Sequence, residues 1–122
     1  MILIAAAAMS ALTFIVHTFV GGVIVARPLL ANTDLPPASK WLNYYCWHIT
    51  TVVIAFIAAG FVWLALHPGD PALLIGLSSL TAALSGLSFA VALKASIAPL
   101  RFPSTSLFAL TSLLGWAALW QT

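Results

Sequence analysis

The hydrophobic pattern of this chain consists of long apolar runs separated by short polar connections. Four runs contain no Asp, Glu, Lys or Arg, and they cover about residues 2–26, 41–66, 72–93 and 104–121. A membrane-spanning helix needs about 20 predominantly apolar residues to cross a hydrocarbon layer of roughly 30 Å. Because lipid offers no partner to free backbone N–H and C=O groups, such runs must be helical. The pattern therefore predicts an all-α integral membrane bundle of four transmembrane helices.

The connections between the runs are short and contain all seven prolines. At the second connection, Asp70 lies where its side chain would cap the third helix, and Pro71 follows at the first helical position. The first run lacks a basic n-region and is longer than the ~7–15 apolar residues of a signal peptide. We therefore expect a retained first helix and a single four-helix domain over residues 1–122.

Composition narrows the class of protein further. Hydrophobic residues make up 63% of the chain and charged residues only 5%, whereas a soluble domain is about 25% charged. Most of the surface must then face lipid, so we expect the bilayer as its main partner. A net charge of +2 does not provide the clustered basic face that nucleic-acid binding needs. Cys46 is alone, so no intramolecular disulfide can form.

The basic residues predict an orientation. Arg27 and Lys40 flank the first connection, and Lys94 and Arg101 flank the third, whereas the second connection and both termini carry no Lys or Arg. Short loops rich in Lys and Arg stay in the cytoplasm. We therefore expect a plasma (inner) membrane protein with loops 27–40 and 94–103 cytoplasmic and both termini outside.

Small residues indicate which helix faces pack. In lipid, small side chains that allow close backbone approach mark helix–helix contacts. Such residues recur at spacings of three and four in the third run, and the first run contributes Gly21 in line with His17. The predicted helix-packing residues are Gly21, Gly76, Ser79, Ala83 and Gly86. Contacts within the bundle and contacts between oligomer subunits are both compatible with these positions.

Two histidines are the candidate site. His17 lies ten residues before Arg27, and His48 eight residues after Lys40, which places them about 15 Å and 12 Å deep by helical rise. Ionisable groups at such depth are uncommon and suggest a site. We predict that both rings point into the bundle and face one another across a shared polar pocket.

Three roles for this pair stay open. The imidazoles can form hydrogen bonds between helices, handle protons or small molecules, or ligate haem b or a metal ion. If the group is haem, its propionates need cationic partners on the cytoplasmic side. Those partners would be Arg27, Lys40 and Arg101.

Two segments carry a resemblance. The run H-T-F-V-G-G-V-I-V-A-R-P-L-L (His17 to Leu30) and the run W-H-I-T-T (Trp47 to Thr51) resemble those of small bacterial four-helix membrane proteins with no assigned function. Those proteins have the pattern H-x-x-x-G…P-L-L followed by W-H-x-T. The first helix is also remotely similar to some haem-binding or copper-related membrane bundles. The resemblance covers the first half of the chain and implies a small integral membrane protein.

Two functional hypotheses follow. Asp34 and Asp70 both lie in connections, so the spans contain no catalytic carboxylate, and we assign no catalytic residue. The first hypothesis is a non-catalytic accessory or interaction subunit that joins a larger membrane complex or self-associates. The alternative is a haem- or metal-binding membrane protein that uses His17 and His48 in electron transfer or related redox chemistry.

Overall fold

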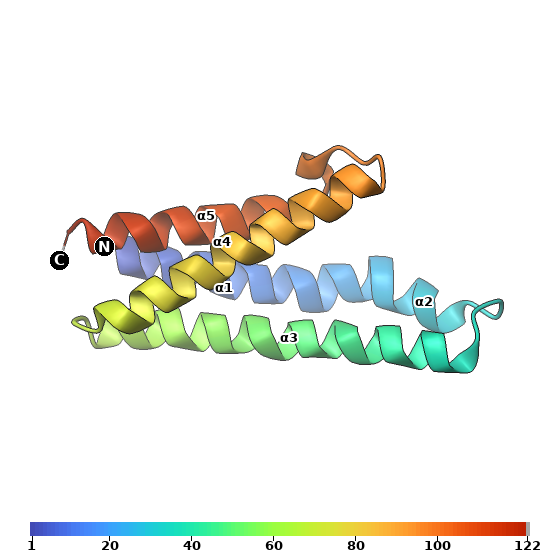
Figure 1. Cartoon of the computed structure of the whole chain (residues 1–122). Coiled ribbons are helices and arrows are strands. Elements are labelled where there is room, and N and C mark those ends of the chain that lie inside the picture. The colour runs from blue at the N-terminus through green and yellow to red at the C-terminus, as the bar shows by residue number, and fades with distance from the viewer. Residues whose placement is uncertain (122) are drawn as a thin grey trace.

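A computed structural model describes residues 1–121, which form four helical rods (Figure 1). The first rod is continuous and contains α1 (Ile2–Ile15), the π-helix η1 (Val16–Ala26) and α2 (Arg27–Ala31). The other rods are α3 (Pro37–Leu66), α4 (Pro71–Lys94) and α5 (Pro103–Leu119), and a 3₁₀ turn, η2 (Pro99–Arg101), precedes α5. The predicted all-α class with four helices is confirmed.

Three of the rods are long and apolar enough to cross a membrane. They are Ile2–Ala31, Pro37–Leu66 and Pro71–Lys94, and α5 is a shorter apolar helix of 17 residues. The first helix continues past Arg27, and the second begins at Pro37 rather than at residue 41. These boundaries differ from the charge-free runs because a charged side chain does not end a helix, and proline is well tolerated in a helix's first turn.

Local capping explains where α4 begins and ends. The Asp70 carboxylate accepts a hydrogen bond from the Leu73 backbone N–H at 2.9 Å, which confirms the predicted N-cap. At the other end, Ser96 adopts a left-handed backbone with φ 57°, and the Ile97 N–H donates to the Ala92 carbonyl at 2.9 Å. This arrangement is a Schellman motif, which satisfies a carbonyl that the last turn of a helix leaves unpaired.

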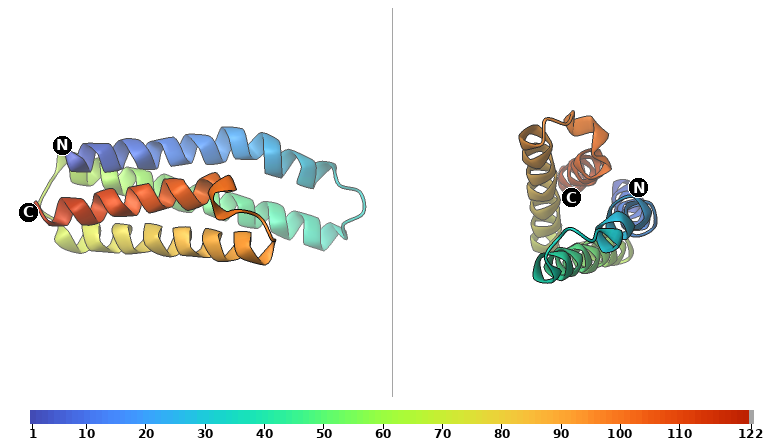
Figure 2. Two further views of the ribbon diagram at one scale, coloured as in Figure 1. Left: turned by 90° about the horizontal axis from the view of Figure 1, so that it is seen from above. Right: turned by 90° about the vertical axis from the view of Figure 1, so that its right-hand side faces the viewer.

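The helices form two hairpins of unequal length. The first rod packs between α3 and α5, and α5 packs between α1 and α4. α3 and α4 are close at the turn that joins them and diverge away from it (Figures 1 and 2). Both termini lie at the same end of the bundle as this turn, and the other two connections lie at the opposite end. The four Lys and Arg side chains therefore belong to one end of the molecule.

The buried core occupies the half of the bundle near the termini. In α3 the buried apolar residues all follow Val53, at spacings of three and four that keep them on one face. The apolar core consists of Ala6, Ala7, Ile54, Ile57, Phe61, Leu64, Leu74, Phe108 and Ala118. The other half of the first hairpin, which includes η1 and the start of α3, lies outside this core.

A seam of hydroxyl groups joins α4 to α5. The Ser85 hydroxyl donates to the Thr105 carbonyl at 2.8 Å, and the Ser112 hydroxyl donates to the Ser78 carbonyl at 2.9 Å. Gly115 lies directly against the Ser78 side chain. Hydrogen bonds and close approach of this kind hold helices together where the surroundings are apolar.

α4 contacts the rest of the bundle through a different face from the one predicted. Gly76, Ser79, Ala83 and Gly86 are all exposed, and a Cβ placed on Gly76 or Gly86 would meet no atom within 4 Å. The helix instead packs through the face that carries Ser78. At about 100° per residue the two faces lie on roughly opposite sides of the helix. The expectation that these small residues make contacts within the bundle is therefore wrong, and the oligomer alternative stays a prediction.

Candidate functional site

His17 is held between η1 and α3. Its ring stacks on the indole of Trp47, with ring centroids 4.1 Å apart and planes inclined by 17°. Its Nε2 lies 3.1 Å from the hydroxyl oxygen of Thr51, one helical turn along α3 from Trp47. One face and one nitrogen of the imidazole thus contact α3 and attach the first rod to it.

The Thr51 hydroxyl links the imidazole to the backbone of α3. Its oxygen lies 3.1 Å from the Trp47 carbonyl, to which it can donate, and 3.1 Å from Nε2 of His17. The tautomer of His17 sets which group donates in the contact between Nε2 and the hydroxyl.

The helix around His17 has an unusual backbone register. In η1 the Arg27 N–H bonds to the Gly22 carbonyl, five residues earlier rather than four. π-helical turns are rare and are frequently found at functional sites. The hydroxyls of Thr13 and Thr51, which lie in α-helical segments, donate to the carbonyl four residues earlier. Within residues 1–121, the buried Thr18 hydroxyl, which lies in η1, has no hydrogen-bond partner.

Gly21 completes the surface that receives Trp47. A Cβ on Gly21 would lie 2.7 Å from Cη2 of the indole, closer than real side chains approach, whereas a Cβ on Gly22 would meet nothing within 4 Å. The indole therefore extends along η1 from His17 to Gly21. Glycine at this position is what lets the first rod and α3 approach closely beside the stacked rings.

The structure places His48 elsewhere than predicted. Its side chain is exposed, and its ring meets Tyr44 of the same helix edge-on, with centroids 4.5 Å apart. Trp47 and Thr51 lie about 40° apart on α3, and His48 is about 100° further round than Trp47. The prediction that both histidines point into the bundle and face one another is therefore wrong for His48. Matched depth along a helix does not determine direction around it.

The predicted cationic partners lie at the end of the bundle away from the termini. The Lys40 ammonium donates to the Leu30 carbonyl at 3.2 Å, which ties the start of α3 to the end of α2. Arg27 and Arg101 are exposed, and Arg101 belongs to η2 in the other hairpin.

Among residues 1–121, no group of three or more His, Cys, Asp and Glu side chains is placed to hold a metal ion.

The site that the structure assembles is an interhelical clamp built around His17. Its α3 partners are an aromatic residue and a hydroxyl at a spacing of four, Trp47 and Thr51, which face the same side of a helix. That spacing is visible in the sequence and could have identified them. Ligation of a metal through Nε2 would require breaking the bond to Thr51.

The chain matches no protein-family model, no curated protein and no solved structure.

Proposed function

We propose that this chain is a non-catalytic subunit embedded in the bacterial inner membrane, which joins a larger membrane complex or a second copy of itself through α4. The observation that carries this proposal is the exposed small-residue face of α4, formed by Gly76, Ser79, Ala83 and Gly86. The resemblance of the first half of the chain to small four-helix membrane proteins agrees with such a role.

The physical support comes from how helices associate in lipid. Apolar side chains gain little by leaving lipid for a protein surface, so close backbone packing and interhelical hydrogen bonds drive association. Gly115 and Ser78 already use this mechanism inside the bundle, where α5 covers α4. The small-residue face of α4 offers the same type of surface without a covering helix. A partner helix can therefore approach α4 closely on this side.

The proposed orientation has both termini and the Pro68–Pro71 turn outside, with loops 27–40 and 94–103 in the cytoplasm. Its support is that all four Lys and Arg residues belong to one end of the bundle (Figure 1). In a Cys46→Ala background, a membrane-impermeant thiol reagent added to intact spheroplasts should label Asp70→Cys and not Asp34→Cys. Labelling of Asp34→Cys alone would show the opposite orientation.

The association is tested by replacing Gly86 with leucine. Because a Cβ at Gly86 meets no atom of the bundle, we expect Gly86→Leu to fold with unchanged helicity and thermal stability in detergent. In lipid vesicles the bulky side chain should block the close approach of a partner helix. We expect loss of the cross-linked complex that native membranes yield with the unsubstituted chain.

Leu87→Ile is the matched control, since it changes the neighbouring exposed residue without adding volume. It should retain the complex. Two results would refute the proposal: equal cross-linking yields for Gly86→Leu and Leu87→Ile, or a chain that stays monomeric and partner-free in native membranes before any substitution.

A further inference from the structure

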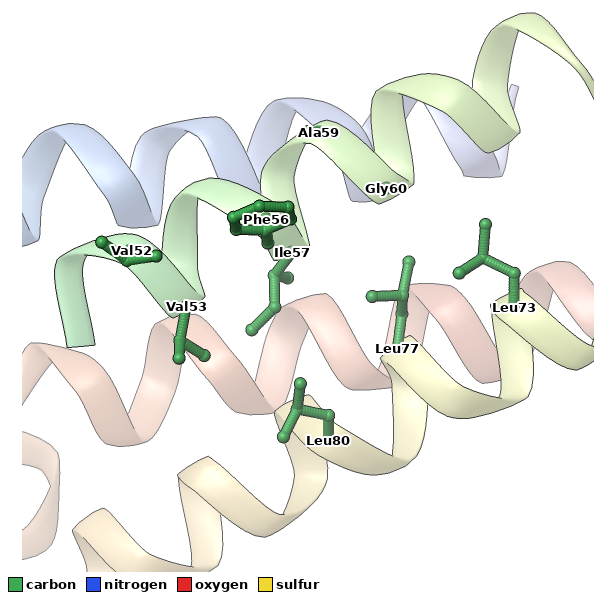
Figure 3. Close-up of a pocket in the computed structure, with 9 residues that line it drawn as sticks. All are labelled: Val52, Val53, Phe56, Ile57, Ala59, Gly60, Leu73, Leu77 and Leu80. Carbon is green, nitrogen blue, oxygen red and sulfur yellow. The ribbon is translucent and has the colours of Figure 1, made fainter. Parts of the chain in front are cut away.

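A groove of about 480 Å³ lies between α3 and α4. Figure 3 shows the apolar side chains of the two helices converging on it, with Val53 and Ile57 directed from α3 and Leu73, Leu77 and Leu80 from α4. Every lining residue is a glycine or has a side chain made of carbon and hydrogen only. The groove therefore offers no hydrogen bond or charge to an occupant, and it selects an apolar group.

The shape of the groove follows from the approach of the two helices at Gly60. A Cβ on Gly60 would lie 2.7 Å from Cδ1 of Leu77, so the helices touch here because glycine has no side chain. Away from the connecting turn α4 leaves α3 to follow α5 (Figures 1 and 2). The result is a wedge that the chain itself does not fill, beside the strongly exposed ring of Phe56, which is 74% accessible.

The dimensions of the groove argue for a thin occupant. On α3 it extends from Val52 to Gly60, a length of about 12 Å by helical rise. Its volume spread over that length corresponds to about half the cross-section of a helix roughly 10 Å wide. A partner helix could insert only side chains, whereas a single alkyl chain can lie along the whole groove.

The depth of the groove relates it to one leaflet. On α4 it extends from Leu73 to Leu80, which is about 3–14 Å from the start of the helix at Pro71. On α3 it lies about 9–21 Å from the end of the helix at Leu66. Half of a hydrocarbon core measures about 15 Å. The groove thus begins in the leaflet that borders the Pro68–Pro71 turn and extends past the middle of the hydrocarbon core. No Lys or Arg lies at this end of the molecule, and the Asp70 carboxylate is engaged in capping α4.

We propose that the groove binds one acyl chain of a phospholipid from the leaflet at the Pro68–Pro71 turn, and that it does so without selecting the headgroup. The acyl chain lies against Phe56, Leu77 and Leu80 and fills the wedge that α3 and α4 leave open. This lipid site is separate from the small-residue face of α4, so its occupation does not require the proposed partner.

The test is native mass spectrometry of the full chain in mild detergent, after equilibration with dioleoyl phosphatidylcholine or dioleoyl phosphatidylglycerol. We expect one retained lipid per chain and equal retention of the two phospholipids. Ala59→Phe places a ring in the groove from its exposed α3 rim and should abolish retention. Ala82→Phe adds the same volume at an exposed α4 position outside the groove and should leave retention unchanged, as should Gly86→Leu.

Circular dichroism and thermal unfolding establish that each variant is folded. If Ala59→Phe does not fold, Leu80→Phe enlarges a second, half-exposed lining residue and takes its place. Equal retention by wild type and the groove-filling variant would overturn the proposal, as would a wild-type chain that retains no lipid. Loss of dimers with unchanged lipid retention in Ala59→Phe would instead assign the groove to a second copy of the chain. Strong preference for one phospholipid would refute the headgroup-independent site.

Discussion

Replacing Gly115 with alanine is expected to destabilise the bundle by about 3 kcal/mol, the upper part of the usual range for overpacking. A Cβ at this position would collide with the Ser78 hydroxyl and would lie 3.1 Å from the Ser78 Cβ and 3.3 Å from Phe61 Cε1. Neither neighbour can move freely, because Ser78 donates to the Leu74 carbonyl at 2.7 Å and Phe61 is fully buried. The added methyl group must therefore separate α5 from α4 or from α3.

The measurement is equilibrium unfolding in mixed micelles, followed by helical circular dichroism. Gly76→Ala is the matched control, since it makes the same chemical change in a helix at a site where nothing lies within 4 Å. There the gain in helix propensity, about 1 kcal/mol, should appear without a steric cost. If Gly115→Ala proved as stable as Gly76→Ala, the close α4–α5 contact would be absent from the folded protein.

Gly21→Ala is expected to have the second largest effect, with a steric cost of about 2 kcal/mol. The new methyl group would overlap the edge of the Trp47 indole, which also stacks on His17. Displacing the indole weakens that stack and the hydrogen bond between His17 and Thr51. The loss of stability should therefore be accompanied by a change in tryptophan fluorescence, measured in a chain whose other four tryptophans are replaced by phenylalanine.

Gly22→Ala provides the comparison for Gly21→Ala. The two glycines are adjacent in η1, so both substitutions change helix propensity by a similar amount, but a Cβ on Gly22 meets no atom within 4 Å. The difference in unfolding free energy between the two variants isolates the contact with Trp47. Indistinguishable stabilities and fluorescence spectra would mean that the indole does not lie against η1.

Several features of the fold could be read from the sequence because they depend on local chemistry. The four apolar runs became helices because an uninterrupted apolar segment of that length has no other way to satisfy its backbone in lipid. Asp70 and Pro71 predicted the start of α4 through capping chemistry that acts within one helical turn. The extension of α3 back to Pro37 was not predicted, since the absence of charge marks depth in the membrane rather than the end of a helix.

The candidate site could be predicted only in part. His17 is an interhelical contact, one of the three roles expected, but its partners are Trp47 and Thr51 and not His48. Adjacent residues on α3 point about 100° apart. The rotation of α3 about its own axis decides which of them meets the first rod. That rotation depends on contacts such as Gly21 with Trp47, which join residues far apart in the chain.

The sequence by itself determined that the chain forms apolar helices, about where they begin and end, and that its basic residues gather at one end. Only the tertiary structure decided which side of each helix is covered. α4 shows this most clearly. It packs through the face that carries Ser78 and exposes the face that carries Gly86, although both faces contain small residues. In water a buried face is more apolar than an exposed one, but a helix in lipid is apolar on both. Hydropathy then no longer distinguishes inside from outside, and the choice rests on the fit between particular side chains on different helices.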